Sequence, residues 1–517
     1  MTARATHLDR SANLHRRGRW WWILVLAVLA LALPLAHYGR LYLANPLRPS
    51  LRSAETLAAA QEMLAAVPAF YRNAVGQGPR IERLELGIDP SGLRRIAEKR
   101  AEALRVGVLF ASRDDLVDAS LRLGEQTLGA RVRLKGDLSD HWAGDRWSLR
   151  GEVTREEVTG GGLTGGGPTG DVLGMRRFSL HAPWTRGFHR EAVFFDVLRH
   201  HGVLAPRAEI VRLVLGGRDI GLMELEQHVG SGLLNGDRRR GIFLRFDEDR
   251  LWREWVAAAE RLGVSWSLEV PKPRDANDWR SAPIDAFESR EIRASAELSR
   301  QLDHAAELLR SAQDGSRLPS EVFDAEGWGT FLAHCEIFGA VHMALWNNLR
   351  FFYDPATQRL HPVAFDTGVL PERERAPSTT AQPTDTAQAT NTVQPTDTVQ
   401  ATNTVQLDCV GGELAFTSTL VADPAIRTEL LQALRRLDDQ VHDPSFEALL
   451  RQQEPRYLAP LHTEFPWLKP FDLGAARRRA VALRGVDAEA SIRRVAPATR
   501  EPGYSFLKRR MTVRLSL

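Results

Sequence analysis

The sequence predicts an α+β protein of two lobes, in which a β-rich small lobe precedes an α-rich large lobe and one transmembrane helix lies near the N-terminus. Three observations support this prediction. An uncharged apolar run occupies residues 20–36, short β-like runs separated by turn residues fill much of residues 80–250, and amphipathic helical patterns dominate later in the chain. Because 517 residues exceed the usual size of one domain, two lobes that share one cleft account for the length.

Composition and charge argue against a nucleic-acid-binding protein. The formal charge of +3 is concentrated at the N-terminus, where the first nineteen residues contain five Arg and one Asp. The remainder of the chain is close to neutral, whereas nucleic-acid binding needs a concentrated basic face. We therefore expect no nucleic acid partner.

The basic N-terminal segment precedes the apolar run WWWILVLAVLALALPLA, an order that is typical of a membrane anchor. We expect a cytoplasmic tail over residues 1–19 and a single-pass anchor over residues 20–36. Because basic flanks stay in the cytoplasm, the main domain should lie on the periplasmic or extracellular side of the inner (cell) membrane. A cleaved signal peptide is the alternative. Residues 37–79 are expected to form a helical stalk, with helical spacing over residues 51–71.

The small lobe is expected over residues 80–250. Its first β-like runs lie at residues 105–110, 120–123 and 130–134, and Lys135 follows the last of them. A lysine at this place either supplies a point charge for a phosphate or is an exposed residue at a strand end. The glycine-rich residues 160–170 lack the Lys-Ser/Thr pair of a phosphate loop, so we interpret them as a flexible hairpin tip.

A helix and a second hairpin complete the small lobe. Residues 190–201 have the spacing of an amphipathic helix, and the runs at residues 209–215 and 220–227 flank a strong turn signal. Glu191 lies near the start of the helix. There it either pairs with a basic residue, such as Lys135 or Arg177, or simply favours the helix N-terminus.

The large lobe is expected over residues 251–370 and 407–517. Helical patterns occur at residues 289–311, 328–345, 423–450 and 475–495. Between the two parts, residues 371–406 contain PTDTAQATNTVQ followed by PTDTVQATNTVQ, a tract too polar to fold alone. We interpret it as a tethered lid, a glycosylatable stalk or a repeat expansion. Cys335 and Cys409, the only cysteines, form one bridge or remain thiols, which excludes a disulfide scaffold.

The most informative stretch is residues 342–368. Residues 349–353 and 360–365 are predicted to be the strands of a hairpin, with a turn at residues 354–357. Asn348 precedes the first strand and Asp366 follows the second, so antiparallel pairing brings an amide oxygen and a carboxylate to the same end. Two such oxygen donors suit Mg²⁺. The alternative is that both residues only cap the hairpin.

Several motifs follow one another in an order that resembles the CotH family of atypical protein kinases. They are MRRFSLHAP at residues 175–183, RE at 190–191, HGVLAPR at 201–207, GLMELEQ at 221–227, and a hairpin carrying YDP that closes on an apolar residue and Asp366. The resemblance implies a two-lobed, kinase-like fold that binds ATP with Mg²⁺ (or Mn²⁺). Asn348 and Asp366 are then the metal-binding residues. A larger set is expected near the nucleotide: Lys135, Arg177, Glu191 and Glu226.

One departure from the kinase pattern concerns the base. In a kinase catalytic loop the proton-accepting Asp lies about five residues before the metal Asn. Met343 stands there in this chain, and no carboxylate is nearby. His342 is the remaining candidate base, because the pKa of a histidine suits proton transfer near neutral pH.

Two functions follow from these expectations. The first is a membrane-anchored kinase that transfers the ATP γ-phosphoryl group to a Ser or Thr of a protein in the cell envelope. The second is a catalytically inactive, kinase-like module for cell-envelope or surface-polymer assembly, which the absent Asp and the scarcity of ATP outside the membrane both favour. A metal-dependent hydrolase is a weaker alternative, because the sequence lacks the His and carboxylate clusters of such sites.

Overall fold

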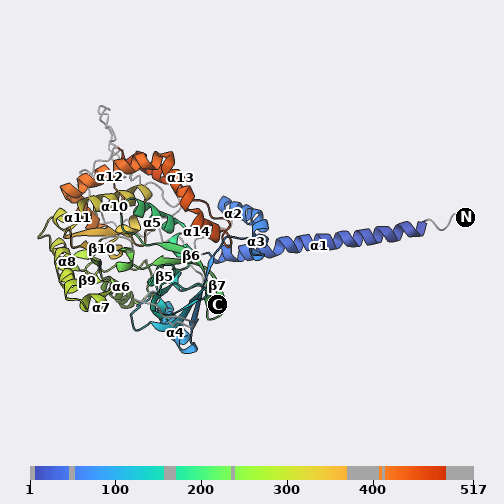
Figure 1. The fold of residues 1–517 in the computed structure, drawn as a ribbon, viewed down its shortest axis with the longest axis horizontal. Helices are drawn as coiled ribbons and strands as arrows, with labels where there is room; N and C mark the ends of the chain where they lie inside the picture. Colours follow the sequence, from blue (N-terminus) through green and yellow to red (C-terminus); the bar gives the residue numbers. More distant parts are fainter. Residues whose placement is uncertain are drawn as a thin grey trace, which may run out of the picture.

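The computed structural model describes residues 6–45, 53–156, 170–234, 239–368, 407–409 and 414–484. It mixes helices and strands, as the sequence predicts, and contains a closed seven-stranded barrel and a separate four-stranded sheet (Figure 1). The glycine-rich residues 160–169, the repeat insertion and the basic C-terminal tail lie outside the described residues.

Helix α1 (Thr6–Ala44) projects away from the body of the molecule (Figure 1). Its 39 residues span about 58 Å, more than the roughly 30 Å of a bilayer core. Within it, Val25–Ala44 is long and apolar enough to cross a membrane, a property that signal sequences share. This segment overlaps the anchor predicted at residues 20–36.

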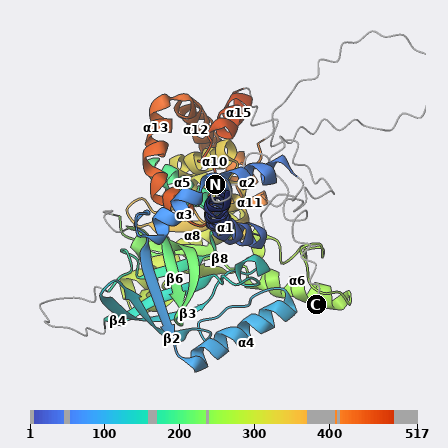
Figure 2. The ribbon, with the colours of Figure 1, turned by 90° about the vertical axis from the view of Figure 1, so that its right-hand side faces the viewer.

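The C-terminal end of α1 packs against protein. Tyr38 and Tyr42 are buried against Ala59 and Met63 of helix α2 (Ala54–Ala65). The predicted helix over residues 51–71 is two helices, because the chain turns at Ala66 before α3 (Val67–Ala74). Figure 2 looks along α1 and shows α2 and α3 gathered beside its end.

The barrel has the strand order β1-β2-β3-β4-β5-β7-β6, and it closes where β1 pairs with β6 in parallel. Its strands are β1 (Glu82–Ile88), β2 (Val117–Leu123), β3 (Gln126–Leu134), β4 (Leu149–Glu156), β5 (Arg177–His181), β6 (Ala208–Leu215) and β7 (Arg218–Gln227). Alternate residues of these strands point inward and form a core of their own. The strands predicted at residues 120–123, 130–134, 209–215 and 220–227 are confirmed.

The strand predicted at residues 105–110 is wrong. The chain there completes helix α4 (Pro90–Val106), which packs against β2 and β3. Asp89 caps the helix by accepting a hydrogen bond from the Gly92 N–H, and Pro90 occupies its first turn. Gly107 ends it with a φ of 91°, a left-handed conformation that suits glycine. These caps decide in favour of a helix over the short apolar run that suggested a strand.

The second sheet has the order β11-β10-β8-β9. Its strands are β8 (Ile242–Phe246), β9 (Ile284–Ala286), β10 (Arg350–Asp354) and β11 (Arg359–Val363). The predicted hairpin is confirmed, since β10 pairs with β11 and Arg350 lies opposite Val363. β8 pairs with β10 although it falls inside the range 80–250 expected for the small lobe, so the barrel itself ends earlier, at Gln227.

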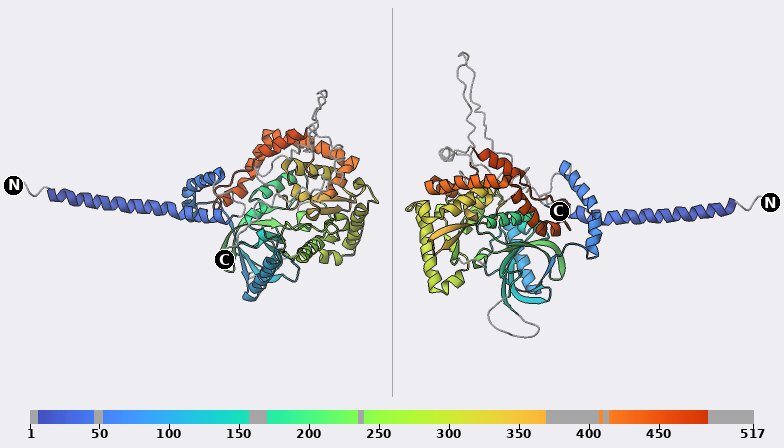
Figure 3. Two further views of the ribbon diagram at one scale, coloured as in Figure 1. Left: turned by 180° about the vertical axis from the view of Figure 1, so that it is seen from behind. Right: turned by 45° about the horizontal axis from the view of Figure 1, so that its top comes forward.

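Helices cover this sheet and form the rest of the body (Figure 3). They are α5 (Arg190–His200), α6 (Asp249–Arg261), α7 (Ser289–Arg293), α8 (Ala296–Asp314), α9 (Pro319–Val322), α10 (Ala325–Phe338), α11 (Ala415–Ala422), α12 (Pro424–His442), α13 (Pro444–Gln453), α14 (Pro455–Leu461) and α15 (Gly474–Leu483). The helix predicted at residues 190–201 is confirmed. Those predicted at residues 289–311 and 423–450 are each divided in two, at the capping residues Ser295 and Asp443.

The helix predicted at residues 328–345 stops early. Gly339 ends α10 with a φ of 59°, and two short 3-10 helices follow, η5 (Val341–Ala344) and η6 (Trp346–Asn348). Of the helix predicted at residues 475–495, the structure describes α15 up to Leu483. Cys335 and Cys409 are both buried free thiols, so no bridge joins them.

Buried ion pairs join the barrel to the C-terminal helices. Arg146 Nη2 lies 2.6 Å from Glu464 Oε2, and the Leu222 N–H of β7 donates to Glu464 Oε1 at 3.2 Å. At the start of α5, His189 Nε2 lies 2.8 Å from Glu454 Oε1. The barrel and the helical body are therefore in direct, specific contact.

Candidate functional site

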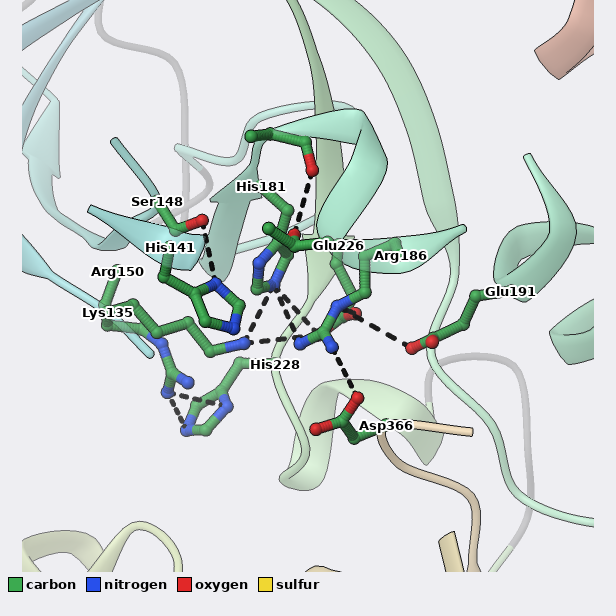
Figure 4. A network of polar contacts seen from close by, with 12 residues as sticks. Lys135, His141, Ser148, Arg150, His181, Arg186, Glu191, Glu226, His228 and Asp366 are labelled. Atoms are coloured by element: carbon green, nitrogen blue, oxygen red, sulfur yellow. Dashed lines mark hydrogen bonds and ion pairs between the residues drawn. The ribbon is translucent and has the colours of Figure 1, made fainter. Parts of the chain in front are cut away.

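A buried polar network lies where one end of the barrel meets the hairpin of the second sheet (Figure 4). Barrel strands and the turns after them supply most of its side chains, and the segment after β11 supplies Asp366. The members are Lys135, His181, Arg186, Glu191, Glu224, Glu226 and Asp366. We call this set the central network.

Lys135 and Glu226 lie close together, and both neighbour His181. Lys135 Nζ lies 2.8 Å from His181 Nε2 and 3.7 Å from Glu226 Oε1. Burial lowers the pKa of Lys135 to about 7, although the Glu226 carboxylate opposes the shift. Burial also keeps the pKa of His181 well below its usual range, as do the neighbouring cations. Because Arg186 Nη2, at 3.3 Å, can only donate, His181 Nε2 is its acceptor.

Arg186 lies at the centre of the network and faces three carboxylates. Its Nη1 donates to Asp366 Oδ1 at 2.6 Å, and its Nε lies 3.2 Å from Glu226 Oε2 and 3.7 Å from Glu191 Oε1. The side chain is 2% exposed. Burial would lower the pKa of Arg186, but the carboxylates, Asp366 first, raise it. Arg186 therefore remains a cation that joins the barrel to the end of the hairpin.

The network contains more carboxyl groups than its cations balance. Both oxygens of Glu224 and one of Glu191 are buried without a hydrogen-bond partner. Burial raises the pKa of both groups, well above the usual range for Glu224, and neighbouring carboxylates add to the effect. Glu226 differs, because Arg186 and Lys135 overcome its burial and hold its pKa well below the usual range.

Asn348 and Asp366 each contact His342, Asn348 at its backbone carbonyl and Asp366 at its ring. Asn348 Nδ2 donates to the His342 carbonyl oxygen at 3.0 Å, and Asp366 Oδ2 lies 3.5 Å from His342 Nε2. Asp366 has a φ of 48°, a strained conformation for a residue other than glycine. Burial would raise the pKa of Asp366, but Arg186 and His342 lower it well below the usual range. For His342, Asp366 outweighs burial and raises the pKa.

Arg177 lies apart from the other expected nucleotide residues. It donates to Glu288 Oε1 at 2.7 Å and also pairs with Glu291, both near helix α7. Glu191 consequently pairs with neither Lys135 nor Arg177, and its ion pair is with Arg186. The carboxylate nearest to Lys135 is instead Glu226, because the strand order β3-β4-β5-β7 places the end of β3 near β5 and β7.

Three members of the network are not among the sequence-predicted site residues: His181, Arg186 and Glu224. His181 and Glu224 lie within the motifs at residues 175–183 and 221–227, whereas Arg186 lies outside them. A partial signal exists in the spacing of Glu224 and Glu226, since residues two apart on a strand share a face. The structure shows that β7 is buried on both faces from Gly221 onward, and that Met223 and Leu225 belong to the core inside the barrel while Glu224 and Glu226 lie on the opposite face. Two carboxylates on one face of a buried strand would have indicated buried cations nearby.

The residues near Asp366 provide fewer ligands than a complete site for a divalent ion needs. Among the described residues, no group of three or more His, Cys, Asp or Glu has the arrangement of a metal site. Asn348 and Asp366 supply two oxygen ligands, a number that suits Mg²⁺ when phosphate oxygens and water complete its shell. One Asp366 oxygen is already paired with Arg186. A cavity of about 540 Å³ beside α13 and α14 shares no lining residue with the central network.

No protein-family model matches the chain, and no curated protein matches it.

Proposed function

We propose that this protein is a membrane-anchored phosphotransferase of the CotH-like kinase class, with a two-lobed, kinase-like fold that uses ATP to phosphorylate a Ser or Thr of a cell-envelope protein. One observation carries the proposal: Arg186 of the barrel and Asp366 of the hairpin meet in a buried, charged network that also contains Lys135. Catalysis of phosphoryl transfer consists mainly of positioning and charge neutralisation, and these residues supply both.

In this proposal Asn348 and Asp366 hold Mg²⁺ (or Mn²⁺) on ATP. The bound ion would neutralise charge on the phosphate oxygens. Lys135 and Arg186 both neighbour His181, and in this proposal they supply the positive charge next to the phosphates. Glu226 orients both cations, because it lies within ion-pair distance of each.

A second candidate is the inactive, kinase-like module for cell-envelope or surface-polymer assembly. It is favoured by the upward shift in the pKa of His342, which Asp366 causes against the effect of burial. An upward shift makes a histidine a poorer general base at a given pH, because more of it carries a proton. The Arg186 pair on Asp366 also competes with a metal ion for that carboxylate.

The test measures nucleotide binding and phosphoryl transfer separately, on the full chain in detergent. We expect ATP with Mg²⁺ or Mn²⁺ to stabilise the wild type, by about 2.7 kcal/mol at a hundredfold excess over Kd. The variant Asp366→Asn should lose the nucleotide effect. Asp219→Asn is the matched control, because Asp219 also pairs with an arginine, Arg212, but on the surface of the barrel.

Transfer is followed as incorporation of γ-phosphate into the chain and into an envelope protein fraction. Stabilisation together with transfer supports the kinase. Stabilisation without transfer selects the inactive module. If no nucleotide stabilises the wild type with either metal, the protein is neither a kinase nor an inactive module that binds nucleotide.

A further inference from the structure

Three arginines surround a pair of rings beside the central network. Arg150 Nη1 lies 2.8 and 2.7 Å from the two ring nitrogens of His228, and the His228 ring contacts Phe287 with 5.4 Å between centroids. The guanidinium carbons of Arg245 and Arg350 lie 5.8 and 6.0 Å from the Phe287 centroid. We call Arg150, Arg245 and Arg350 the arginine cluster. It combines β4 of the barrel with β8 and β10 of the second sheet.

Two of the three arginines have no ion pair among the described residues. In the described part of the chain, neither Arg150 nor Arg350 lies within ion-pair distance of a carboxylate. Arg350, 4% exposed, donates only to the carbonyl oxygens of Asn347 and Leu349, and the Nε of Arg150 is buried without a partner. Arg245 pairs with Asp285, whose side chain is 45% exposed.

Mutual repulsion acts on two of these arginines. Burial and the neighbouring guanidinium groups lower the pKa of Arg150 to about 9 and that of Arg350 to about 10, although more distant carboxylates, Glu226 for Arg150 and Glu248 for Arg350, oppose the shifts. Burial acts to lower the pKa of Arg245 as well, but that pKa is instead raised, chiefly by Asp285. His228 offers no compensation, because burial and Arg150 hold its pKa well below the usual range and leave it neutral.

Packing against rings does not account for these charges. A cation over an aromatic face is stabilised by about 0.5–2 kcal/mol. Burying an unpaired charge costs several kcal/mol. The arrangement is therefore expected to be completed by an anion.

We propose that Arg150, Arg245 and Arg350 bind a phosphate group of a ligand. Planar guanidinium groups bind phosphate through two parallel hydrogen bonds, and three of them match a group with more than one negative charge. The site lies next to the central network without being part of it. Phe365 is a neighbour of both: its ring centroid lies 4.3 Å from the guanidinium carbon of Arg350 and 5.5 Å from Lys135 Nζ.

The proposal does not require phosphoryl transfer, so its failure can be distinguished from failure of the kinase. Two sources can supply the phosphate. One is the phosphate chain of a nucleotide held at the central network, and the other is a phosphate monoester on a second molecule.

The test is calorimetric titration of the full chain in detergent with inorganic pyrophosphate and, separately, with phosphoserine. We expect binding that weakens about tenfold or more in Arg150→Gln and in Arg245→Gln, since each removes a charge-assisted hydrogen bond of about 1.5 kcal/mol or more. Arg245 is 33% exposed, so its variant should fold even if Arg150→Gln does not. Arg212→Gln, at another arginine that pairs with an aspartate, is the matched control and should bind as the wild type does.

Saturating ATP then separates the two sources. If ATP displaces pyrophosphate, the site holds the nucleotide phosphates; if pyrophosphate still binds, the phosphate belongs to a second molecule. Pyrophosphate or phosphoserine should still bind to Asp366→Asn, which removes a charge from the central network and none from the arginine cluster. The proposal is overturned if the wild type binds neither ligand, if both cluster variants bind as the wild type does, or if Asp366→Asn alone abolishes binding.

Discussion

Glu224 and Glu226 lie two positions apart on β7 and show how strongly position decides the behaviour of a buried carboxyl group. Both are almost inaccessible to solvent. Glu226 lies within ion-pair distance of Arg186 and Lys135, whereas neither oxygen of Glu224 has a hydrogen-bond partner. Their pKa values consequently move in opposite directions: the pKa of Glu226 is held well below the usual range and that of Glu224 is raised well above it.

This contrast gives a matched pair of isosteric substitutions. We expect Glu226→Gln to lower the free energy of unfolding by about 3 kcal/mol, because it leaves buried cations short of a partner. Glu224→Gln removes no hydrogen bond or ion pair, because neither Glu224 oxygen has a partner, and should change stability by less than about 1 kcal/mol. The measurement is chemical denaturation of the full chain in detergent, followed by tryptophan fluorescence. Equal losses in the two variants would contradict the assignment.

The same pair has a pH dependence of known sign. The pKa of Glu224 is raised by folding, so its stabilising contribution is complete below the pKa of an unfolded glutamate, about 4.3, and is lost as pH rises. Wild-type stability should therefore fall relative to that of Glu224→Gln as pH rises above about 4.3. A difference that stays constant over this range would contradict a raised pKa.

At the scale of elements, helix α10 sets the position of the residues that precede the hairpin. It packs against α12 along one side and ends at Gly339, after which η5 and η6 carry His342 and Asn348. The two helices approach closely at Gly329. A Cβ added there would lie 2.6 Å from a backbone carbon of Glu429 in α12. The contact leaves no room for a side chain.

We expect Gly329→Ala to destabilise the protein by about 1–3 kcal/mol, because the helices must separate to admit the methyl group. The higher helix propensity of alanine offsets part of this loss. Gly144→Ala is the control, since a Cβ at Gly144 has no neighbour within 4 Å. Thermal unfolding of both variants against the wild type decides the matter. A Gly329→Ala variant as stable as the control would show that α10 and α12 are less tightly packed than described.

In the whole molecule, the candidate membrane helix α1 packs directly against the folded body. The exposed apolar side chains of α1 include Trp22, Leu26 and Leu33, whereas its last turns are packed. The Tyr42 ring meets Trp467, which follows α14, with 5.1 Å between centroids. Removal of α1 as a signal sequence would strip these partners from the body.

We therefore expect α1 to remain in the mature protein. Intact-mass measurement of protein purified from membranes should give the full 57.7 kDa chain, and the protein should resist extraction by alkaline carbonate. A mature chain that begins after α1, or release by carbonate, would identify the segment as a signal sequence. Trp467→Ala, which removes a packing partner without shortening the apolar run, should leave the membrane association unchanged.

Several helices and strands of this protein could be predicted from local sequence patterns. Capping residues, turn residues and apolar periodicity act over a few positions, and they fixed the hairpin, the strands β2, β3, β6 and β7, helix α5 and the apolar N-terminal segment. The hairpin also determined that Asn348 and Asp366 lie at one end, because antiparallel pairing follows from a short turn.

The partners of the buried charged residues could not be predicted from the sequence, because they depend on the tertiary fold. The strand order β3-β4-β5-β7 places the end of β3 near β5 and β7, so the partners of Lys135 are His181 and Glu226 rather than the expected Glu191. Arg186 joins that end to Asp366, 180 positions away in the chain. The arginine cluster likewise draws on two different sheets. Such partners are set by long-range strand order and burial, and no pattern over neighbouring residues encodes them.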